Sequence, residues 1–210
     1  MLMEQTLSGF ADEAAARQST PGGGAISAYV GALGAAMGAM AARFTEGRKG
    51  FEEHAEALAA EIGRLDEVRL QLQELVDADA AAFDKVTTAY GLPKSNDEEK
   101  AARREAIQQA LVAAMQPPLE ACRAAVVGLE VLDSLRGHVN KHLASDVAVG
   151  AYALAAAFRG ASINVLINLA GIKDTAIREK VSEEGGALAE TVTRLESTIS
   201  QDVLASLQGS

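Results

Sequence analysis

The chain has 210 residues, of which 49% are hydrophobic but only 4% aromatic, and it carries a formal net charge of −10. This length suits a single domain over residues 1–210, and the negative charge disfavours nonspecific binding to nucleic acid or to an anionic membrane. Prolines and alternating β-branched runs are scarce, which argues against a large sheet. We therefore expect an all-α protein, a multihelical bundle of long antiparallel helices. The single cysteine, Cys122, fits a reducing compartment such as the cytoplasm.

The first predicted elements are a short amphipathic helix over residues 1–17 and a glycine-rich loop over residues 19–25. Three consecutive glycines lose more backbone entropy on folding than an ordinary helix start requires. The first N–H groups of the helix that follows have no partner within the helix and carry the positive end of its dipole. We therefore interpret this loop as the wall of a ligand site, with a plain start of a tightly packed helix as the alternative. The residues assigned to the wall are Pro21, Gly22, Gly23 and Gly24.

The next predicted helix covers residues 25–44 and carries no charge up to position 42. Its alanines and glycines supply little free energy for transfer into a membrane, so we interpret it as a buried helix rather than a membrane span. Gly31, Gly34 and Gly38 share one stripe of this helix, which lets another backbone approach closely. We expect an internal or subunit contact along the stripe.

A predicted loop over residues 45–50 holds Arg48 and Lys49 between two glycines. Apolar residues at helical spacing then predict one long helix, or two with a bend between them, over residues 51–90. Asp79 falls on the apolar stripe of this helix, where a buried carboxylate needs a partner or a proton. It is a candidate acid or base, and a hydrogen-bonded structural aspartate is the alternative.

Residues 91–93 end that helix, and the polar residues that follow predict a cap for a helix running to about residue 115. Pro117 and Pro118 are then expected to interrupt the chain, and Pro118 to open a further helix over residues 119–136. A last amphipathic helix is predicted over residues 174–207, with a break at Gly185-Gly186 left open.

Between these helices, residues 137–146 form a second unusual polar stretch. It is predicted to lead into a helix capped near Ser145 that runs to about residue 170. Asn164 and Asn168 lie four positions apart on this helix, where they either brace neighbouring helices or present amides to a ligand. His138 and His142 also lie four apart, but no motif supplies a third ligand, so we expect no metal.

Several segments occur together in a distinctive order. The chain contains Ser-Thr-Pro-Gly-Gly-Gly-Ala at 19–25, Arg48-Lys49, Asp79, Ala82-Phe83, Tyr-Gly-Leu-Pro-Lys at 90–94, Asp-Glu-Glu-Lys-Ala-Ala-Arg at 97–103, Asn140, Ser145-Asp146, Asn164 and Asn168. This order and spacing resemble the cyclodeaminase/cyclohydrolase family of folate enzymes over nearly the whole chain. The resemblance implies an all-helical homodimer that acts on one-carbon tetrahydrofolates without a metal or other cofactor.

The segments at 90–94 and 97–100 look most like those of stand-alone methenyltetrahydrofolate cyclohydrolases. The expected reaction is therefore hydrolysis of 5,10-methenyltetrahydrofolate to 10-formyltetrahydrofolate. Formiminotetrahydrofolate cyclodeaminase, an ammonia lyase, is the alternative activity, and a folate-binding helical protein without turnover is a third possibility. Two departures from the family pattern bear on substrate handling: Phe51 stands where an aromatic hydroxyl is common, and His142 where a second asparagine is common.

The resemblance also implies roles for individual side chains. Asp79 and Asp146 are the candidate catalytic carboxylates, which could stabilise the cationic carbon of the substrate and take a proton from the attacking water. Asn164 and Asn168 could hydrogen-bond the pterin edge or the adduct. The basic residues expected to meet the glutamate tail are Arg48, Lys49 and Lys141. Asn140 is assigned to substrate binding by the resemblance alone.

Overall fold

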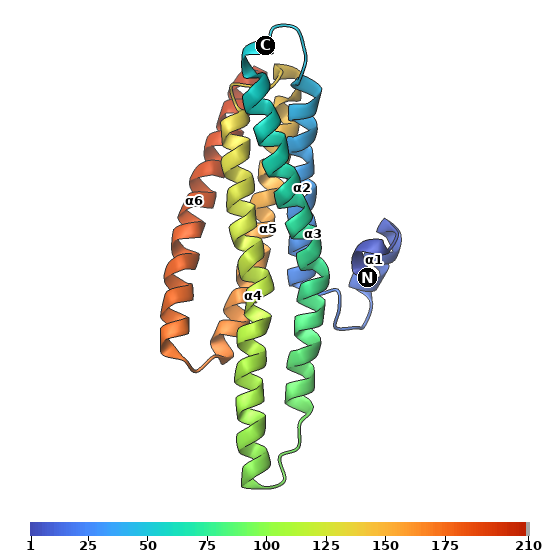
Figure 1. Cartoon of the computed structure of the whole chain (residues 1–210), viewed down its shortest axis with the longest axis vertical. Helices are drawn as coiled ribbons and strands as arrows, with labels where there is room; N and C mark the ends of the chain where they lie inside the picture. The colour runs from blue at the N-terminus through green and yellow to red at the C-terminus, as the bar shows by residue number, and fades with distance from the viewer. Residues whose placement is uncertain (209–210) are drawn as a thin grey trace.

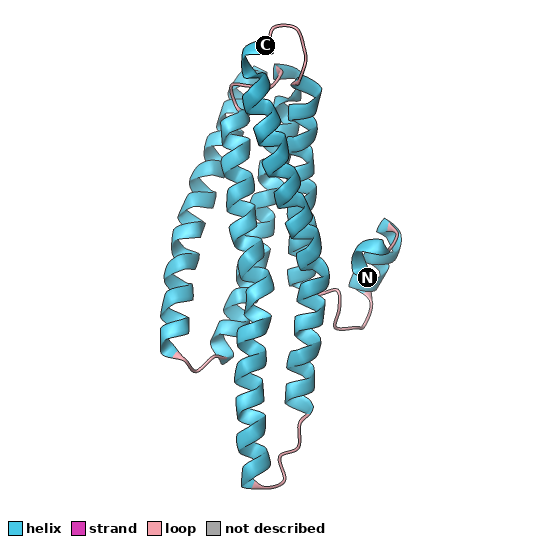
Figure 2. Ribbon diagram, in the orientation of Figure 1, coloured by secondary structure: helices cyan, strands magenta, loops and turns pink. Residues whose placement is uncertain are grey.

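The computed structural model describes the backbone of residues 1–208 and the side chains of residues 1–205. Five long helices form one elongated bundle (Figure 1), and the described part contains no strand (Figure 2). The long helices are α2 (Gly23–Thr45), α3 (Ala55–Gly91), α4 (Asp97–Leu135), α5 (Ala144–Gly171) and α6 (Thr175–Gln208). The shorter elements are η1 (Leu2–Glu4), α1 (Leu7–Ala15), η2 (Glu52–His54) and η3 (Lys141–Leu143). The all-α prediction is therefore confirmed.

The Gly/Ala-rich helix α2 is the most buried part of the bundle and packs mainly on α3 and α5. Its glycine stripe is an internal contact. A Cβ on Gly34 would lie 2.8 Å from the carbonyl oxygen of Gly150, and a Cβ on Gly38 would lie 2.2 Å from Leu132 Cδ2. Because neither neighbour leaves room for a methyl group, the stripe sets how closely α2, α4 and α5 approach one another.

Two segments, Gly23–Thr45 and Lys141–Gly171, are long and apolar enough to cross a membrane by length and composition. In the α2 segment, 61% of the most apolar window is buried inside the bundle, and the α5 segment has 39% buried. The apolar character of α2 is thus largely explained by packing within the bundle, as for the core helix of a soluble protein. Helix α5 keeps a substantial apolar face outside it.

The predicted interruption at Pro117-Pro118 is wrong, because α4 runs through both prolines from Asp97 to Leu135. Pro118 has no N–H to donate to the carbonyl of Ala114, which a proline in a helix normally leaves without a partner. Here the side-chain Nδ2 of Asn168 donates to that carbonyl at 3.4 Å. Pro118 itself is buried, and the helix continues through it.

Other boundaries differ from the predictions as well. Residues 1–17 form the turn η1 and the short helix α1, which begins after Thr6 because the Thr6 hydroxyl accepts the Gly9 N–H at 3.0 Å. Helix α5 starts at Ala144 with no side-chain cap, so Ser145 does not cap it. Helix α6 continues through Gly185-Gly186 without the break that the sequence left open. The helix predicted over 51–90 is confirmed as one helix, α3, from Ala55 onwards.

Candidate functional site

A cavity of about 410 Å³ lies where the start of α2 meets α3, α4 and the C-terminal half of α5. We call it the Asp79 cavity. Its polar lining comes from the loop before α2, from α3 and from α5, and includes Ser19, Thr20, Gly22, Gly23, Asp79, Asn164 and Asn168. Its apolar lining comprises Phe83, Val86, Tyr90, Leu111, Ala114 and Ile167. Another cavity of about 260 Å³ between α4, α5 and α6 is mostly apolar and contains none of the predicted site residues.

Asp79 binds the first turn of α2. The Ala25 N–H donates to Asp79 Oδ2 at 3.0 Å, and the N-cap residue Gly22 has no side chain that could accept this bond. The Asp79 side chain of α3 therefore caps the N-terminus of α2, a role that the N-cap residue's own side chain usually has. A Cβ on Gly24 would lie 2.2 Å from Asp79 Oδ1, so this close approach requires glycine at position 24.

Two opposing influences act on the Asp79 carboxyl group. Burial raises its pKa above the ordinary value of 3.8, whereas the hydrogen bond from Ala25 lowers it. Burial is the larger influence, so the pKa is raised overall. A carboxyl group with a raised pKa at the wall of a cavity suits proton transfer to or from a ligand.

Asn164 and Asn168 lie on the α5 wall of the cavity, opposite the glycine loop. Asn164 Nδ2 donates to the Gly160 carbonyl at 2.9 Å, and Asn168 Nδ2 donates to the Asn164 carbonyl at 3.0 Å as well as to Ala114. A Cβ on Gly23 would lie 3.2 Å from Asn164 Nδ2. These bonds use the NH₂ groups, so the amide oxygens are the atoms that can accept a hydrogen bond from a ligand. This geometry is compatible with both predicted roles of the two asparagines, which are to brace neighbouring helices and to contact a ligand.

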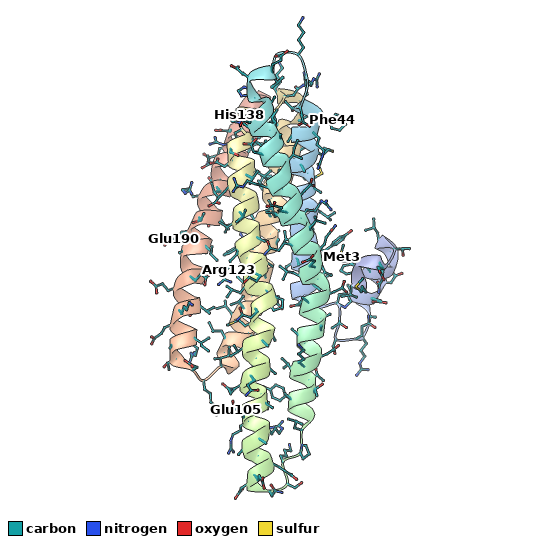
Figure 3. All side chains as sticks on the ribbon, viewed as in Figure 1. Met3, Phe44, Glu105, Arg123, His138 and Glu190 are labelled. Carbon is teal, nitrogen blue, oxygen red and sulfur yellow. The ribbon has the colours of Figure 1, made fainter. Side chains whose placement is uncertain are left out.

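The remaining predicted site residues form a separate cluster at the other end of α2, which we call the distal group. It consists of Arg48, Lys49, Asn140, Lys141 and Asp146. Asp146 precedes Asn164 by eighteen positions on α5, a distance of about 27 Å along the helix axis. Figure 3 shows Phe44 and His138 at this end of the bundle and Glu105 towards the opposite end. One chain therefore does not bring Asp146 to the cavity that holds Asp79.

Within the distal group, Asn140 is buried and has structural partners. Its backbone N–H donates to Thr45 Oγ1 at 3.1 Å, and its side-chain oxygen accepts the His142 N–H at 3.0 Å. Arg48 and Lys49 are exposed in the turn after α2. Among the described residues, no group of three or more His, Cys, Asp or Glu side chains is arranged to hold a metal ion.

Comparison with known proteins places the chain in a family. The family model for formiminotransferase-cyclodeaminase matches residues 6–186. The chain belongs to the formiminotransferase-cyclodeaminase family. It is 37% identical over 191 residues to a methenyltetrahydrofolate cyclohydrolase from Methylorubrum extorquens, a match that covers 90% of this chain and 92% of that protein. The family that the sequence motifs predict is thereby confirmed.

Two further family members show how the chain relates to the cyclodeaminases. It is 36% identical to the formimidoyltransferase-cyclodeaminase of Mus musculus, but that match covers only 35% of the mouse protein. The crystal structure of formiminotetrahydrofolate cyclodeaminase from Thermotoga maritima matches with a TM-score of 0.86 and 33% identity, over 100% of this chain and 98% of that one. The helical fold is thus shared along the full length of a family member.

The residues that line the Asp79 cavity and that the sequence assignment left out include four with large apolar or aromatic side chains on α3 and α5: Phe83, Val86, Tyr90 and Ile167. Three of them follow Asp79 on the apolar stripe of α3, at four, seven and eleven positions. That spacing puts them on one helix face, so the stripe itself was the signal. Ile167 is 66% exposed and sits next to Asn168 on α5.

Proposed function

We propose that this protein hydrolyses 5,10-methenyltetrahydrofolate to 10-formyltetrahydrofolate. The observation that carries this proposal is the end-to-end match with a methenyltetrahydrofolate cyclohydrolase, 37% identical over 92% of that protein. The Asp79 cavity supports it, since it combines a carboxyl group with a raised pKa, two amide oxygens and an apolar wall. These groups match a substrate that has a cationic carbon, a polar pterin edge and aromatic faces.

The reactive carbon of the substrate lies between two nitrogens and shares their positive charge. Ionised Asp79 beside this carbon would stabilise the cation and accept a proton from water as the new C–O bond forms. The tetrahedral adduct then opens by cleavage of one C–N bond. The proton is passed to the departing nitrogen, and the formyl group stays on the other nitrogen. Because the carbon is already electrophilic, we infer that the reaction needs no metal or cofactor.

The amide oxygens of Asn164 and Asn168 would accept hydrogen bonds from the N–H groups of the pterin. Phe83, Val86 and Ile167 offer apolar surface to its ring faces. The start of α2 lies behind Asp79, where the positive end of the helix dipole favours the ionised carboxylate. In this arrangement Gly23 and Gly24 serve mainly to bring the α2 backbone close to Asn164 and Asp79.

We further propose that the protein is a homodimer that pairs through the outer faces of α2 and α5. These faces carry large apolar side chains that are about half exposed or more, namely Leu33, Phe44, Val149, Tyr152, Ile163, Leu166 and Ile167. An apolar surface of this kind on a soluble bundle typically marks an interface. An interface on this face would also explain why the α5 segment is apolar enough to cross a membrane.

Such a dimer would change which residues lie near the distal group. A two-fold axis across the middle of α2 runs the two copies of this helix in opposite directions, so the distal group of one copy would lie near the cavity of its partner. Ile167 supports this arrangement, because it belongs both to the exposed face and to the lining of the cavity. The predicted role of Asp146 depends on this pairing.

We place the protein in the cytoplasm. Its one cysteine, Cys122, is buried as a free thiol, and burial raises the pKa of this thiol to about 12. A thiol of this kind is unreactive and requires no oxidising compartment.

Cyclodeamination is the second candidate function, favoured by the TM-score of 0.86 with a formiminotetrahydrofolate cyclodeaminase. That reaction closes the same methenyl ring by attack of one nitrogen on the formimino carbon, and it expels ammonia. It would use the same carboxylate as a proton carrier, so the geometry of one cavity is compatible with both reactions.

The two activities are separated by one pair of assays on the purified protein. We expect rapid loss of the 5,10-methenyltetrahydrofolate chromophore, well above the rate in buffer, and no ammonia from 5-formiminotetrahydrofolate. The Asp79→Asn variant at equal concentration is the matched control for contaminating activity. Ammonia release by the wild type would overturn the cyclohydrolase in favour of the cyclodeaminase. Inactivity on both compounds would instead favour a folate-binding protein without turnover.

A further inference from the structure

Tyr90 lies at the end of the Asp79 cavity that is farthest along α3 from the carboxylate, and Arg103 of α4 contacts this residue. Tyr90 lines the cavity and follows Asp79 by eleven positions, about 16 Å along the helix axis. We propose that Arg103, held against Tyr90, binds the anionic glutamate tail of the folate substrate. This inference rests on the proposed function and names the residue that recognises the tail.

Arg103 is held in place by the last turn of α3. Its Nε and Nη2 both donate to the Tyr90 carbonyl, at 3.3 and 3.0 Å, and its Cζ lies 5.7 Å from the centre of the Tyr90 ring. Because Nε and Nη2 donate to the carbonyl, the N–H groups of Nη1 are the donors that stay available to a ligand. A guanidinium already fixed in this way loses little entropy when it binds a carboxylate.

The order of groups along α3 matches the order of groups in the substrate. The reactive carbon, which Asp79 would face, sits between the pterin and the aminobenzoyl ring, and the glutamate follows that ring. Phe83 and Val86 lie between Asp79 and Tyr90, where the aminobenzoyl ring would pass. A substrate with its reactive carbon at Asp79 therefore directs its tail toward Tyr90 and Arg103.

Charge points to the same residue. In a protein of net charge −10, an anionic tail needs a local cation. Arg48, Lys49 and Lys141, the cations expected from the sequence, belong to the distal group and would reach this cavity only through the proposed partner copy, whereas the same chain holds Arg103 against Tyr90. Two carboxylates close to Arg103 on α4 have partners other than Arg103: Glu99 accepts the Ser95 N–H at 2.7 Å, and Glu105 accepts from Gln109 at 2.8 Å.

A purely structural role is the competing explanation, because Arg103 also satisfies a carbonyl in the last turn of α3. The two explanations differ in one measurable property. Loss of a cap lowers stability whatever the substrate, whereas loss of a tail contact changes KM only for a substrate that has the tail.

The test measures kcat and KM for 5,10-methenyltetrahydrofolate and for 5,10-methenyltetrahydropteroate, which lacks the glutamate. Arg103→Met should raise KM for the full substrate about tenfold with kcat within twofold, as expected for loss of a charge-assisted contact. Its KM for the tail-less compound should stay at the wild-type value, and Arg103→Lys should restore part of the loss. Arg104→Met, at the neighbouring exposed arginine, is the matched control and should behave as wild type on both compounds.

An unchanged KM for the full substrate in Arg103→Met, or an equal rise for both compounds, would overturn the inference. A tail-dependent rise in an Arg48→Met/Lys49→Met double variant instead of Arg103→Met would assign the tail to the distal group. Calorimetric titration with tetrahydrofolate and tetrahydropteroate keeps the proposed function separate. If wild type hydrolyses neither substrate but Arg103→Met weakens only tetrahydrofolate binding, the activity proposal fails and the tail site stands. If wild type binds neither compound, both proposals fail.

Discussion

The two ends of α2 use the same residue types for different purposes. At its start, Gly24 is needed for space, because a Cβ would collide with Asp79 Oδ1 at 2.2 Å. At its end, Gly47 and Gly50 have φ values of 71° and 91° with nothing within 4 Å of an added Cβ, so they are needed for backbone conformation. A glycine that makes room for a neighbouring functional group marks a site more reliably than a glycine that makes a turn.

The two candidate catalytic carboxylates, Asp79 and Asp146, also differ in their surroundings. Asp79 is half-buried, bonded to the α2 backbone and placed on the wall of a cavity. Asp146 lies in the first turn of α5, about 27 Å from Asn164 along that helix. The cavity end is thus equipped for chemistry within one chain, whereas the distal group contributes only if a partner copy brings it there.

The largest expected effect comes from Asp79→Asn. It should lower kcat/KM for methenyltetrahydrofolate by about 10³-fold, in the range for loss of a general acid or base, and leave the helical circular dichroism unchanged. The fold should persist because the amide oxygen of asparagine can still accept the Ala25 N–H. Asp146→Asn should lower kcat/KM less, by about tenfold. Near wild-type rates in Asp79→Asn would remove Asp79 from the mechanism.

Mixing the two variants tests how the ends of the molecule cooperate. If each active site combines Asp79 of one copy with Asp146 of the other, a heterodimer of Asp79→Asn and Asp146→Asn chains contains one intact site. After random exchange of subunits, we expect about a quarter of the wild-type activity, well above either variant alone. Size-exclusion chromatography with light scattering confirms the dimer. Activity no higher than the mean of the two variants would show that the site lies within one chain.

Much of the cavity end could be predicted from the sequence. Asp79 stood out because a carboxylate on an apolar stripe is unusual, and the glycine loop because three glycines exceed what a helix start needs. The separation of the distal group from the cavity could not be predicted, because spacing along the chain does not reveal which end of a bundle a helix start occupies. Asp79 lies within α3 and Asn140 follows α4, and only the packing of these helices places the two residues apart.

The continuous helix α4 could not be predicted for a different reason. Local propensity stops a helix at Pro117-Pro118, but the Asn168 side chain, fifty residues later, reaches the Ala114 carbonyl that Pro118 leaves open. This contact also shows why Asn168 looked ambiguous from sequence. It braces α4 through Nδ2 and still belongs to the cavity lining.

A smaller effect distinguishes the two kinds of glycine. Gly24→Ala should displace the Asp79 carboxylate, costing about 1–3 kcal/mol of stability and most of the activity. Gly47→Ala should cost about 1 kcal/mol because alanine disfavours a positive φ, and it should leave kcat and KM as in wild type. Urea denaturation and the methenyltetrahydrofolate assay on both variants measure this contrast. Full activity in Gly24→Ala would mean that the loop only starts a helix.

The smallest effect concerns the proton on Asp79. Because its pKa is raised in the folded state, the protonated carboxyl contributes stability that is fully present below the unfolded value near 3.8 and is lost as pH rises through the folded pKa. Asp79→Asn cannot titrate at this position. We therefore expect the variant to gain stability relative to wild type as pH increases from 4 to 7, measured by urea denaturation at each pH.

A constant difference across that range would mean that the two influences on this carboxyl group cancel, and a variant that instead loses stability relative to wild type as pH rises would reverse their balance. That reversal would mean that the Ala25 N–H and the start of α2 stabilise the ionised form more than burial destabilises it. Asp79 would then be better suited to holding a cationic ligand than to accepting a proton from water. The pH dependence of stability thus distinguishes the two catalytic roles that the cavity geometry allows for the same carboxylate.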